Sequence, residues 1–238
     1  MITPLIRKLS QAVDFSDDDL ATLTRLTSRQ RTVGPRTALI HEGDRPGPVR
    51  LIMKGLACRY QSLPDGSRQI VALLIPGDFC DLHVAILDRM DHSLGTLSNC
   101  DIVEIPRAAV LSLIETSPSI TRALWWATLV DEAILRNWLV NKGRRQADLQ
   151  LLNLFCELLC RYEVAGLAQG DTFPLPLTQE ELSDVMGVSV VHANRTLNSL
   201  REAGLVTFEK GSVTFPDRAR AYEVAEFDPT YLHLTRRR

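Results

Sequence analysis

The sequence predicts an α+β protein that consists of an antiparallel β-roll, one long helix and a winged helix-turn-helix, in that order. Residues 31–106 hold short β-type runs separated by turn signals, with no helical pattern among them. The stretch that follows contains no Gly or Pro between residues 119 and 141. Residues 177–206 are typical of two short capped helices joined by a tight turn. The expected domains are the roll in residues 1–117, the long helix in 118–142 and the helix-turn-helix in 143–238.

The composition is that of an ordinary globular protein, with 45% hydrophobic residues and a formal net charge of −2. Such a balance does not attract a polyanion, so any nucleic-acid site has to be built locally. The five scattered cysteines do not form a secreted disulfide framework, and neither a signal peptide nor a run of about 18 apolar residues occurs. We therefore expect a reduced, cytoplasmic, soluble protein without membrane contact.

A short helix is expected ahead of the roll, in residues 16–27. Ser16 can cap this helix, and Asp19 completes a capping box while adding negative charge at the positive end of the helix dipole. The strands of the roll are expected in the runs VRLIMKG, LACRYQSL, RQIVALLI and CDIVEI, between turn signals such as LPDGS and PGD. Short strands at this spacing favour an antiparallel roll or barrel.

The long helix is expected to begin at Ser117 and Pro118, since Ser is a good N-cap and Pro fits the first turn. Some 24 helical residues would extend about 36 Å at 1.5 Å per residue. The helix is apolar on more than one face, so we expect it both to cover its own roll and to pair with a second copy. One heptad register gives the dimer seam, in which a lone Asn could set the pairing. This seam consists of Ala123, Trp126, Val130, Ala133, Asn137 and Val140.

The segment 141–150 is the expected hinge between the domains. Gly143 is a plausible C-terminal stop for the long helix, and two arginines follow it. A second helix is expected from there to about Tyr162, with a stripe of Leu and Phe along one face. Cys156 and Cys160 lie four residues apart on this helix, and we expect them to pack as small buried hydrophobic side chains.

The helix-turn-helix is expected from its caps. Thr178 and Glu181 form a capping box at the first helix, and Gly187 can take the positive φ of a tight turn. Ser189 then caps the second helix, whose buried face repeats at helical spacing in Ala193, Leu197 and Leu200. The run TFEKGSVTF that follows alternates apolar and polar residues around a Lys-Gly turn, which is typical of a two-stranded wing.

The first turns of the second helix present the chemistry that a DNA major groove requires. Arg195 can bond a guanine edge or a phosphate, Asn194 can pair with adenine, and a small apolar side chain can contact a thymine methyl group. Lys210 at the wing tip could reach a phosphate. The expected DNA-contacting residues are Thr178, Ser189, Val190, Val191, His192, Asn194, Arg195, Asn198 and Lys210.

An ordinary helical hairpin with a solvated face remains the alternative interpretation. Residues 178–215 carry three basic and five acidic side chains, so the local charge does not settle the matter. In that case the C-terminal part would make a sensor or interaction module that docks on protein rather than DNA. An enzyme is not expected, because no Ser/His/Asp order, metal motif or phosphate loop appears.

Nearly the whole chain resembles the Crp/Fnr family of bacterial transcription regulators. The resemblance is carried by LTQEELSDVMGVSVVHANRTLNSLREAGLV and VRLIMKGLACRYQSLPDGSRQIVALLIPGDF. It implies a cyclic-nucleotide-binding-like β-roll, a dimer helix, binding of a palindromic double-stranded DNA operator as a homodimer, and contact with RNA polymerase. The family's recognition arginine falls on Arg195. Val191 and Asn194 differ from the family's frequent Glu and small residue, so we expect a different half-site.

The effector pocket implied by the resemblance departs from the cyclic-nucleotide pattern. The position of the ribose-binding Glu is Leu82 and that of the phosphate-binding Arg is His92, while Ser93 alone matches. Cyclic AMP is therefore not expected. No cysteine precedes Cys58, which does not fit the N-terminal cysteine cluster of iron–sulfur members. Haem is a third option, and the effector stays unknown. The candidate pocket residues are Cys80, Leu82, His83, His92 and Ser93.

Overall fold

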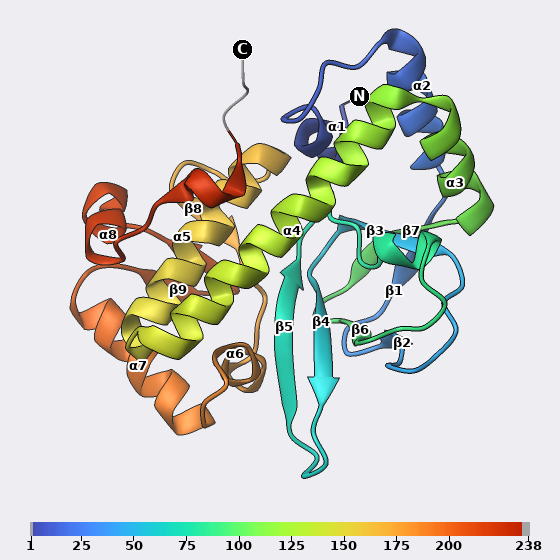
Figure 1. The fold of residues 1–238 in the computed structure, drawn as a ribbon. Helices are drawn as coiled ribbons and strands as arrows, with labels where there is room; N and C mark the ends of the chain where they lie inside the picture. The colour runs from blue at the N-terminus through green and yellow to red at the C-terminus, as the bar shows by residue number, and fades with distance from the viewer. Residues whose placement is uncertain (1, 235–238) are drawn as a thin grey trace.

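The computed structural model describes residues 2–234. Its N-terminal half is a roll of two antiparallel sheets (Figure 1). The predicted roll is thus confirmed. Three strands, β1, β2 and β6, were not among the predicted runs, because they are three or four residues long and too short to show a period. One sheet has the order β1 (Gln30–Val33), β7 (Cys100–Ile105), β3 (Val49–Lys54). The other has the order β2 (Ala38–Ile40), β6 (Ser93–Thr96), β4 (Ala57–Ser62), β5 (Arg68–Leu74).

Three short helices accompany the roll: α1 (Pro4–Leu9), α2 (Asp17–Leu26) and α3 (Arg107–Thr116). The predicted capping box of α2 is present, with the hydroxyl of Ser16 accepting from the backbone N–H of Asp19. The Asp19 carboxylate also accepts from Ser117 and Ser119, which ties α2 to the start of the long helix. The sequence did not predict α1 and α3, since one has six residues and the other has no side-chain cap.

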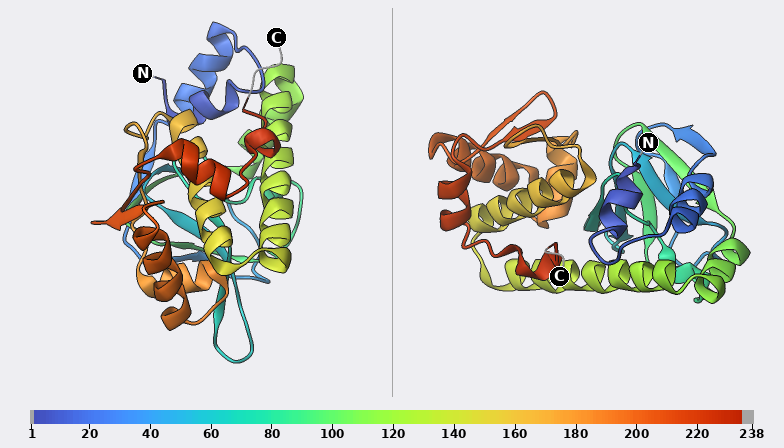
Figure 2. Two further views of the ribbon diagram at one scale, coloured as in Figure 1. Left: turned by 90° about the vertical axis from the view of Figure 1, so that its left-hand side faces the viewer. Right: turned by 90° about the horizontal axis from the view of Figure 1, so that it is seen from above.

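The long helix α4 (Pro118–Arg144) runs along both halves of the molecule (Figure 2). Its first half packs on the interior of the roll through Ile120, Ala123 and neighbouring side chains. Its second half packs through Ile134 and Trp138 against α5 (Ala147–Ala165) and the outer face of the β4–β5 sheet. The helix therefore belongs to two cores. Within residues 2–234, no helix has the length and apolarity needed to cross a membrane.

The predicted helix stop at Gly143 is wrong. α4 continues through Gly143 to Arg144, and α5 begins at Ala147. Tertiary contacts hold the last turn helical. The side chain of Asn141 donates to Asn137 and Asn153, and Lys142 donates to the backbone carbonyl of Val185 in the next domain. The break between the two helices therefore lies at residues 145–146.

The C-terminal domain contains the predicted helix-turn-helix and wing. The wing has a third strand that the sequence did not reveal, and the sheet order is β8-β10-β9. This strand has three residues and its central residue, Phe173, lies 40 positions before its partner Val213, so only the fold brings the two together. The elements are β8 (Thr172–Pro174), α6 (Gln179–Met186), α7 (Val190–Glu202), β9 (Thr207–Glu209), β10 (Ser212–Thr214), α8 (Arg218–Val224) and the 3₁₀ turn η2 (Pro229–Leu232).

All five cysteines are buried and free. Burial raises the pKa of the Cys58 thiol to about 12 and that of Cys80 well above its usual range. Such thiols stay protonated and unreactive at neutral pH. The side chains of Cys156 and Cys160 on α5 pack in the hydrophobic core, as predicted.

A buried ionic network joins the two halves of the protein. Arg161 on α5 donates to Asp78 of the roll at 2.7 Å and to Glu157 at 3.0 Å. Lys8 adds a second ion pair to Asp78 at 2.7 Å. Burial alone would raise the pKa of Asp78, but Lys8 and Arg161 outweigh it and hold that pKa at about 2. Burial raises the pKa of Glu157, against the opposing effect of Arg161.

Candidate DNA-binding surface and sensor cavity

The helix-turn-helix is held by the caps that the sequence predicted. The hydroxyl of Thr178 accepts from the N–H of Glu181, whose carboxylate accepts in return from the N–H of Thr178. Gly187 takes the left-handed conformation (φ 67°) that ends α6. The hydroxyl of Ser189 accepts from the N–H of His192 at the start of α7. Thr178 and Ser189 thus serve as caps, and their contact with DNA stays a prediction.

The two faces of α7 separate as its periodicity predicted. Ala193, Leu197 and Leu200 are buried in the domain core. Val191 is 79% exposed, and Arg195 and Asn198 are also exposed on the outer face. Val190 is 38% exposed at the beginning of the helix, and His192 is half-buried. The outer face of the first two turns is therefore free to meet a large ligand.

Asn194 is less available than the sequence indicated. Its side-chain amide donates to Gln179 Oε1 at 2.9 Å, and the residue is half-buried between the two helices. The sequence reasoning missed Gln179, although its place directly after the capping threonine puts it opposite the start of α7. Arg195 contacts His192 Nδ1 at 3.1 Å, so the guanidinium is already oriented along the exposed face.

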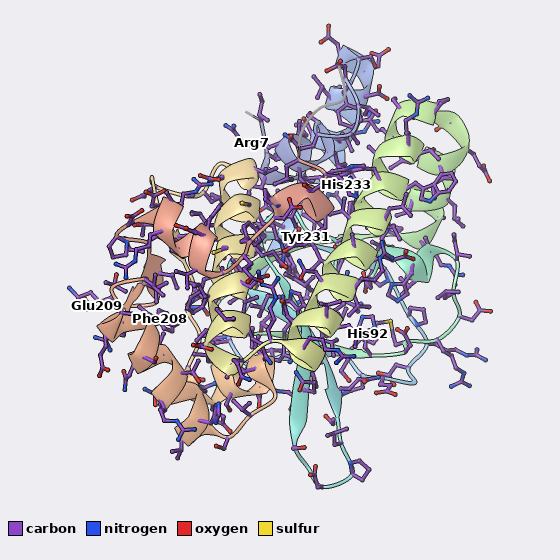
Figure 3. The ribbon with its side chains drawn as sticks, turned by 60° about the vertical axis from the view of Figure 1, so that its left-hand side comes forward. Arg7, His92, Phe208, Glu209, Tyr231 and His233 are labelled. Atoms are coloured by element: carbon purple, nitrogen blue, oxygen red, sulfur yellow. The ribbon has the colours of Figure 1, made fainter. Side chains whose placement is uncertain are left out.

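The wing extends the same surface. Lys210 and Gly211 both have positive φ at the tip, which is the two-residue hairpin turn that a Lys-Gly pair can form. Lys210 is exposed there. Arg201, on the last turn of α7, lies 3.9 Å from Glu209 and links the helix to the wing. Figure 3 shows Phe208 and Glu209 of the wing at the edge of the domain, away from the roll.

The helix-turn-helix is anchored to the roll through its first helix and its turn. Arg68 forms an ion pair with Asp184 at 2.6 Å, and Gln69 donates to the backbone carbonyl of the same residue. A side chain at Gly187 would come within 2.7 Å of the Gln69 amide oxygen. The turn of the motif is thus packed closely against β5. These contacts leave the outer face of α7 uncovered.

Most of the predicted dimer seam is covered within its own protomer. Ala123, Val130 and Ala133 are buried within their own chain, and Trp126 and Asn137 are half-buried. Val140 alone of the six is exposed, at 56%. The more apolar face of the helix packs on the protein's own two cores, which the heptad pattern could not distinguish from pairing with a partner. A different face carries the exposed apolar stripe, formed by Trp125, Leu129, Leu135, Leu139 and Val140.

A cavity of about 540 Å³ lies between the roll and α4. Of the five predicted pocket residues, His83 and His92 line it. Cys80, Leu82 and Ser93 do not. Cys80 is buried in the roll core, Leu82 packs against the same core, and the hydroxyl of Ser93 accepts from the N–H of Glu42. From α4 the lining includes Thr128, Asp131, Glu132, Ile134 and Leu135.

The cavity offers no free cation to a phosphate. Of the residues that line it, Arg59 is bound to Asp131 at 2.8 Å and to the carbonyls of Phe79 and Cys80. Arg161 is committed to the buried network described above. A cyclic nucleotide phosphate needs an uncommitted positive charge, and the absence of cyclic AMP binding stays a prediction.

Two histidines and one aspartate meet at this cavity. His92 Nδ1 lies 2.6 Å from Asp91 Oδ1, and His83 Nε2 lies 3.9 Å from the same oxygen. Burial lowers the pKa of both imidazoles, and Arg59 lowers it further. Within residues 2–234, this is the only group of three or more metal-ligating side chains close enough to share an ion. The sequence missed it, because Asp91 was not considered and no metal site was expected.

Two family models match the chain. The Cyclic nucleotide-binding domain matches residues 30–117, which contain the roll and α3. The Crp-like helix-turn-helix domain matches residues 150–220, from α5 into α8. They occur in one chain, in the same order as the two halves of the structure. The chain belongs to the Crp/Fnr family.

Known relatives align with most of this Crp/Fnr protein. The transcriptional activator protein FnrL of Cereibacter sphaeroides is 27% identical over 94% of this chain and 90% of its own length. The nitrogen fixation regulation protein FixK of Bradyrhizobium diazoefficiens is 27% identical over 73% of this chain and 72% of its own. The solved structure of FixK2 from Bradyrhizobium japonicum has the same fold, with a TM-score of 0.70 at 19% identity, covering 82% of this chain and 96% of that one.

The family assignment decides between the two functions that the sequence left open. With a Crp-like helix-turn-helix domain, this Crp/Fnr protein is a DNA-binding transcription regulator. The alternative, a C-terminal module that docks on protein instead of DNA, is not favoured. The cyclic-nucleotide-binding match describes the fold of the roll, and a fold can persist when the residues that bind its ligand have changed.

Proposed function

We propose that this protein binds a palindromic operator as a homodimer, with α7 of each protomer in a major groove and Lys210 of each wing on a phosphate. The observation that carries the proposal is the exposed outer face on the first two turns of α7, which presents Val191, Arg195 and Asn198 together. A small apolar group, a two-pronged cation and an amide are the side-chain types that distinguish base edges in the major groove.

Arg195 is proposed to make the most specific contact. It is the charged residue in the first two turns of α7, and its guanidinium can donate two parallel hydrogen bonds to a guanine. The contact with His192 holds the side chain along the outer face before DNA binds. Asn198 lies one turn further on and is proposed to assist. Asn194 is proposed to position α7 against α6 through Gln179, more than to read a base.

Dimerisation is proposed through the exposed stripe of α4. A stripe of five large apolar side chains on one face of a 27-residue helix is costly in water, and a second copy related by a two-fold axis would cover it. The net positive charge near α7 is low, so each protomer can contact few phosphates. A dimer on two half-sites doubles the number of contacts and so raises the affinity for the operator. We also propose that the domains meet at residues 117 and 145. The protein is proposed to act in the cytoplasm and to contact RNA polymerase.

We expect Arg195→Ala to cost about 1–3 kcal/mol on the cognate operator and to flatten discrimination at one base pair. Lys210→Ala should weaken binding to all sequences about equally and reduce the salt slope by about one, because a wing lysine meets phosphate. Both variants are measured on cognate and scrambled duplexes at fixed salt, and again over a salt series.

Arg201→Ala is the matched control, since Arg201 lies on the last turn of α7 beside Glu209, away from the proposed base contacts. It should keep the discrimination of the wild type. Arg195→Lys retains the positive charge but cannot donate two parallel hydrogen bonds. Relative to Arg195→Ala, it should therefore restore nonspecific affinity without restoring specificity. If Arg195→Ala weakens both duplexes equally, Arg195 is a phosphate contact and the proposed readout is wrong.

A further inference from the structure

We propose that His83, Asp91 and His92 bind one divalent first-row transition-metal ion at the cavity between the roll and α4. The three residues come from two places in the roll. His83 lies on the 3₁₀ turn η1 (Leu82–Ala85), and Asp91 and His92 lie at the end of the following loop, directly before β6. Figure 3 shows His92 beside α4. The proposal does not depend on how the protein reads DNA.

The ligand atoms are already close to the spacing that a metal ion needs. One ligand atom from each of the three side chains lies within 4.8 Å of the others, and the two imidazole ring centres are 5.3 Å apart. Bonds of about 2.0–2.2 Å to an ion place ligand atoms roughly 3 Å apart. The 2.6 Å contact between His92 and Asp91 therefore opens slightly, and the 3.9 Å gap to His83 closes. Asp91 is 77% exposed and can make most of this adjustment.

One nitrogen of each histidine, Nε2, has no hydrogen bond within residues 2–234. Nε2 of His83 and Nε2 of His92 are both buried and lack a hydrogen-bond partner among the residues that the structure describes. A buried polar atom without a partner costs about 1–3 kcal/mol, so a ligand that satisfies His83 Nε2 is favoured. In this geometry His83 offers Nε2 and His92 offers Nδ1 to an ion beside Asp91 Oδ1.

The charges around the cluster favour a cation over an anion. Arg59 and Arg161, the two arginines of the cavity, are bound to carboxylates and carbonyls. Asp91 faces the two imidazoles, whereas the carboxylates of Asp131 and Glu132 on α4 are paired with Arg59 and Arg136. A phosphate ligand would meet no uncommitted positive charge. A divalent ion would meet the Asp91 carboxylate as a direct ligand.

The ligand types identify the class of ion. Two imidazoles and one carboxylate suit Zn²⁺, Fe²⁺, Co²⁺ or Ni²⁺, whereas Mg²⁺ and Ca²⁺ prefer oxygen ligands. Three protein ligands leave at least one coordination position for water or a small molecule, and here that position would face the cavity of about 540 Å³.

The test uses the full-length protein, treated with a chelator, dialysed and titrated with Co²⁺ by visible absorption and with Zn²⁺ by calorimetry. We expect one ion per chain and the d–d absorption of Co²⁺ bound to mixed nitrogen and oxygen ligands. His83→Ala and His92→Ala should each weaken binding by about 100-fold or more, since loss of an outer-shell partner alone costs 10–100-fold. Asp91→Asn should weaken it as well.

Matched controls are available on the same domain. His41→Ala removes an exposed histidine outside the cluster, and Asp88→Asn removes an exposed carboxylate of the same loop. Both should bind the ion as the wild type does, and far-UV circular dichroism should show that every variant is folded. The proposal is overturned if binding is not saturable below about 1 mM, or if the His83 and His92 variants bind like the controls. Haem that binds through these same histidines in preference to the ion would overturn it too.

Discussion

Leu139→Asp is expected to convert the protein to a monomer and to lower its affinity for a two-half-site operator by about 10²–10⁴-fold. Leu139 is 72% exposed on α4 and belongs to the stripe that we propose as the dimer surface. A charge there leaves the protomer core intact but would place an unpaired carboxylate in an apolar interface. Once the protomers separate, the second half-site no longer binds as part of one complex. Sedimentation at micromolar concentration and operator titration measure the two effects.

Leu63→Asp is the control for this experiment. Leu63 is 50% exposed, close to the value for Leu139, but lies in the β4–β5 turn, far along the chain from α4. It should remain dimeric and keep its operator affinity. Val130→Asp would not serve, because Val130 is 4% exposed and its replacement would damage the protomer's own core. A Leu139→Asp protein that stays dimeric would show that the exposed face of α4 is not the dimer surface.

Arg161→Leu is expected to lower the free energy of unfolding by about 3–5 kcal/mol, because it leaves two buried carboxylates without their shared cation. Asp78 would retain Lys8, whereas Glu157 would keep only neutral donors, Trp138 and Tyr231. Denaturant unfolding at pH 7 measures the loss. Arg136→Leu, which breaks an exposed i,i+4 pair with Glu132, is the control and should change stability by less than about 0.5 kcal/mol.

The pH dependence distinguishes the two carboxylates. Asp78 has a lowered folded pKa of about 2, so its contribution of about 2 kcal/mol is present above its unfolded pKa and is lost as the pH falls through the folded value. Glu157 has a raised folded pKa, so its burial favours folding at low pH and opposes it as the pH rises. Without Arg161 the pKa of Glu157 should rise further. The loss in Arg161→Leu should therefore shrink from pH 8 to pH 5, and a constant loss would contradict this assignment.

Local signals in the sequence determined the start of α2 and most of the helix-turn-helix. The capping boxes at Ser16 and Thr178, the left-handed turn at Gly187 and the cap at Ser189 all appear where the residue types predict them. These features depend on hydrogen bonds within four residues, so the chain encodes them without reference to the rest of the fold. The buried face of α7 follows from the same local period.

Tertiary structure alone decided the features that depend on distant partners. α4 has two apolar faces, and only the packed domains show that Val130 faces inward while Leu139 faces outward. Gly143 stays helical because Asn141 and Lys142 bind residues beyond the turn, and a local stop signal is too weak to compete with these contacts.

The residues that line the cavity between the roll and α4 were also decided by the tertiary structure. The sequence placed Cys80 and His83 together because they are three residues apart, but the chain turns between them and buries the thiol in the roll. His83 instead meets Asp91 and His92 across a loop, at a distance that no local period encodes. The sequence by itself thus determined the helix-turn-helix and the exposed outer face of α7. Only the fold decided which residues share the cavity and which face of α4 stays open, because both depend on how separate elements pack.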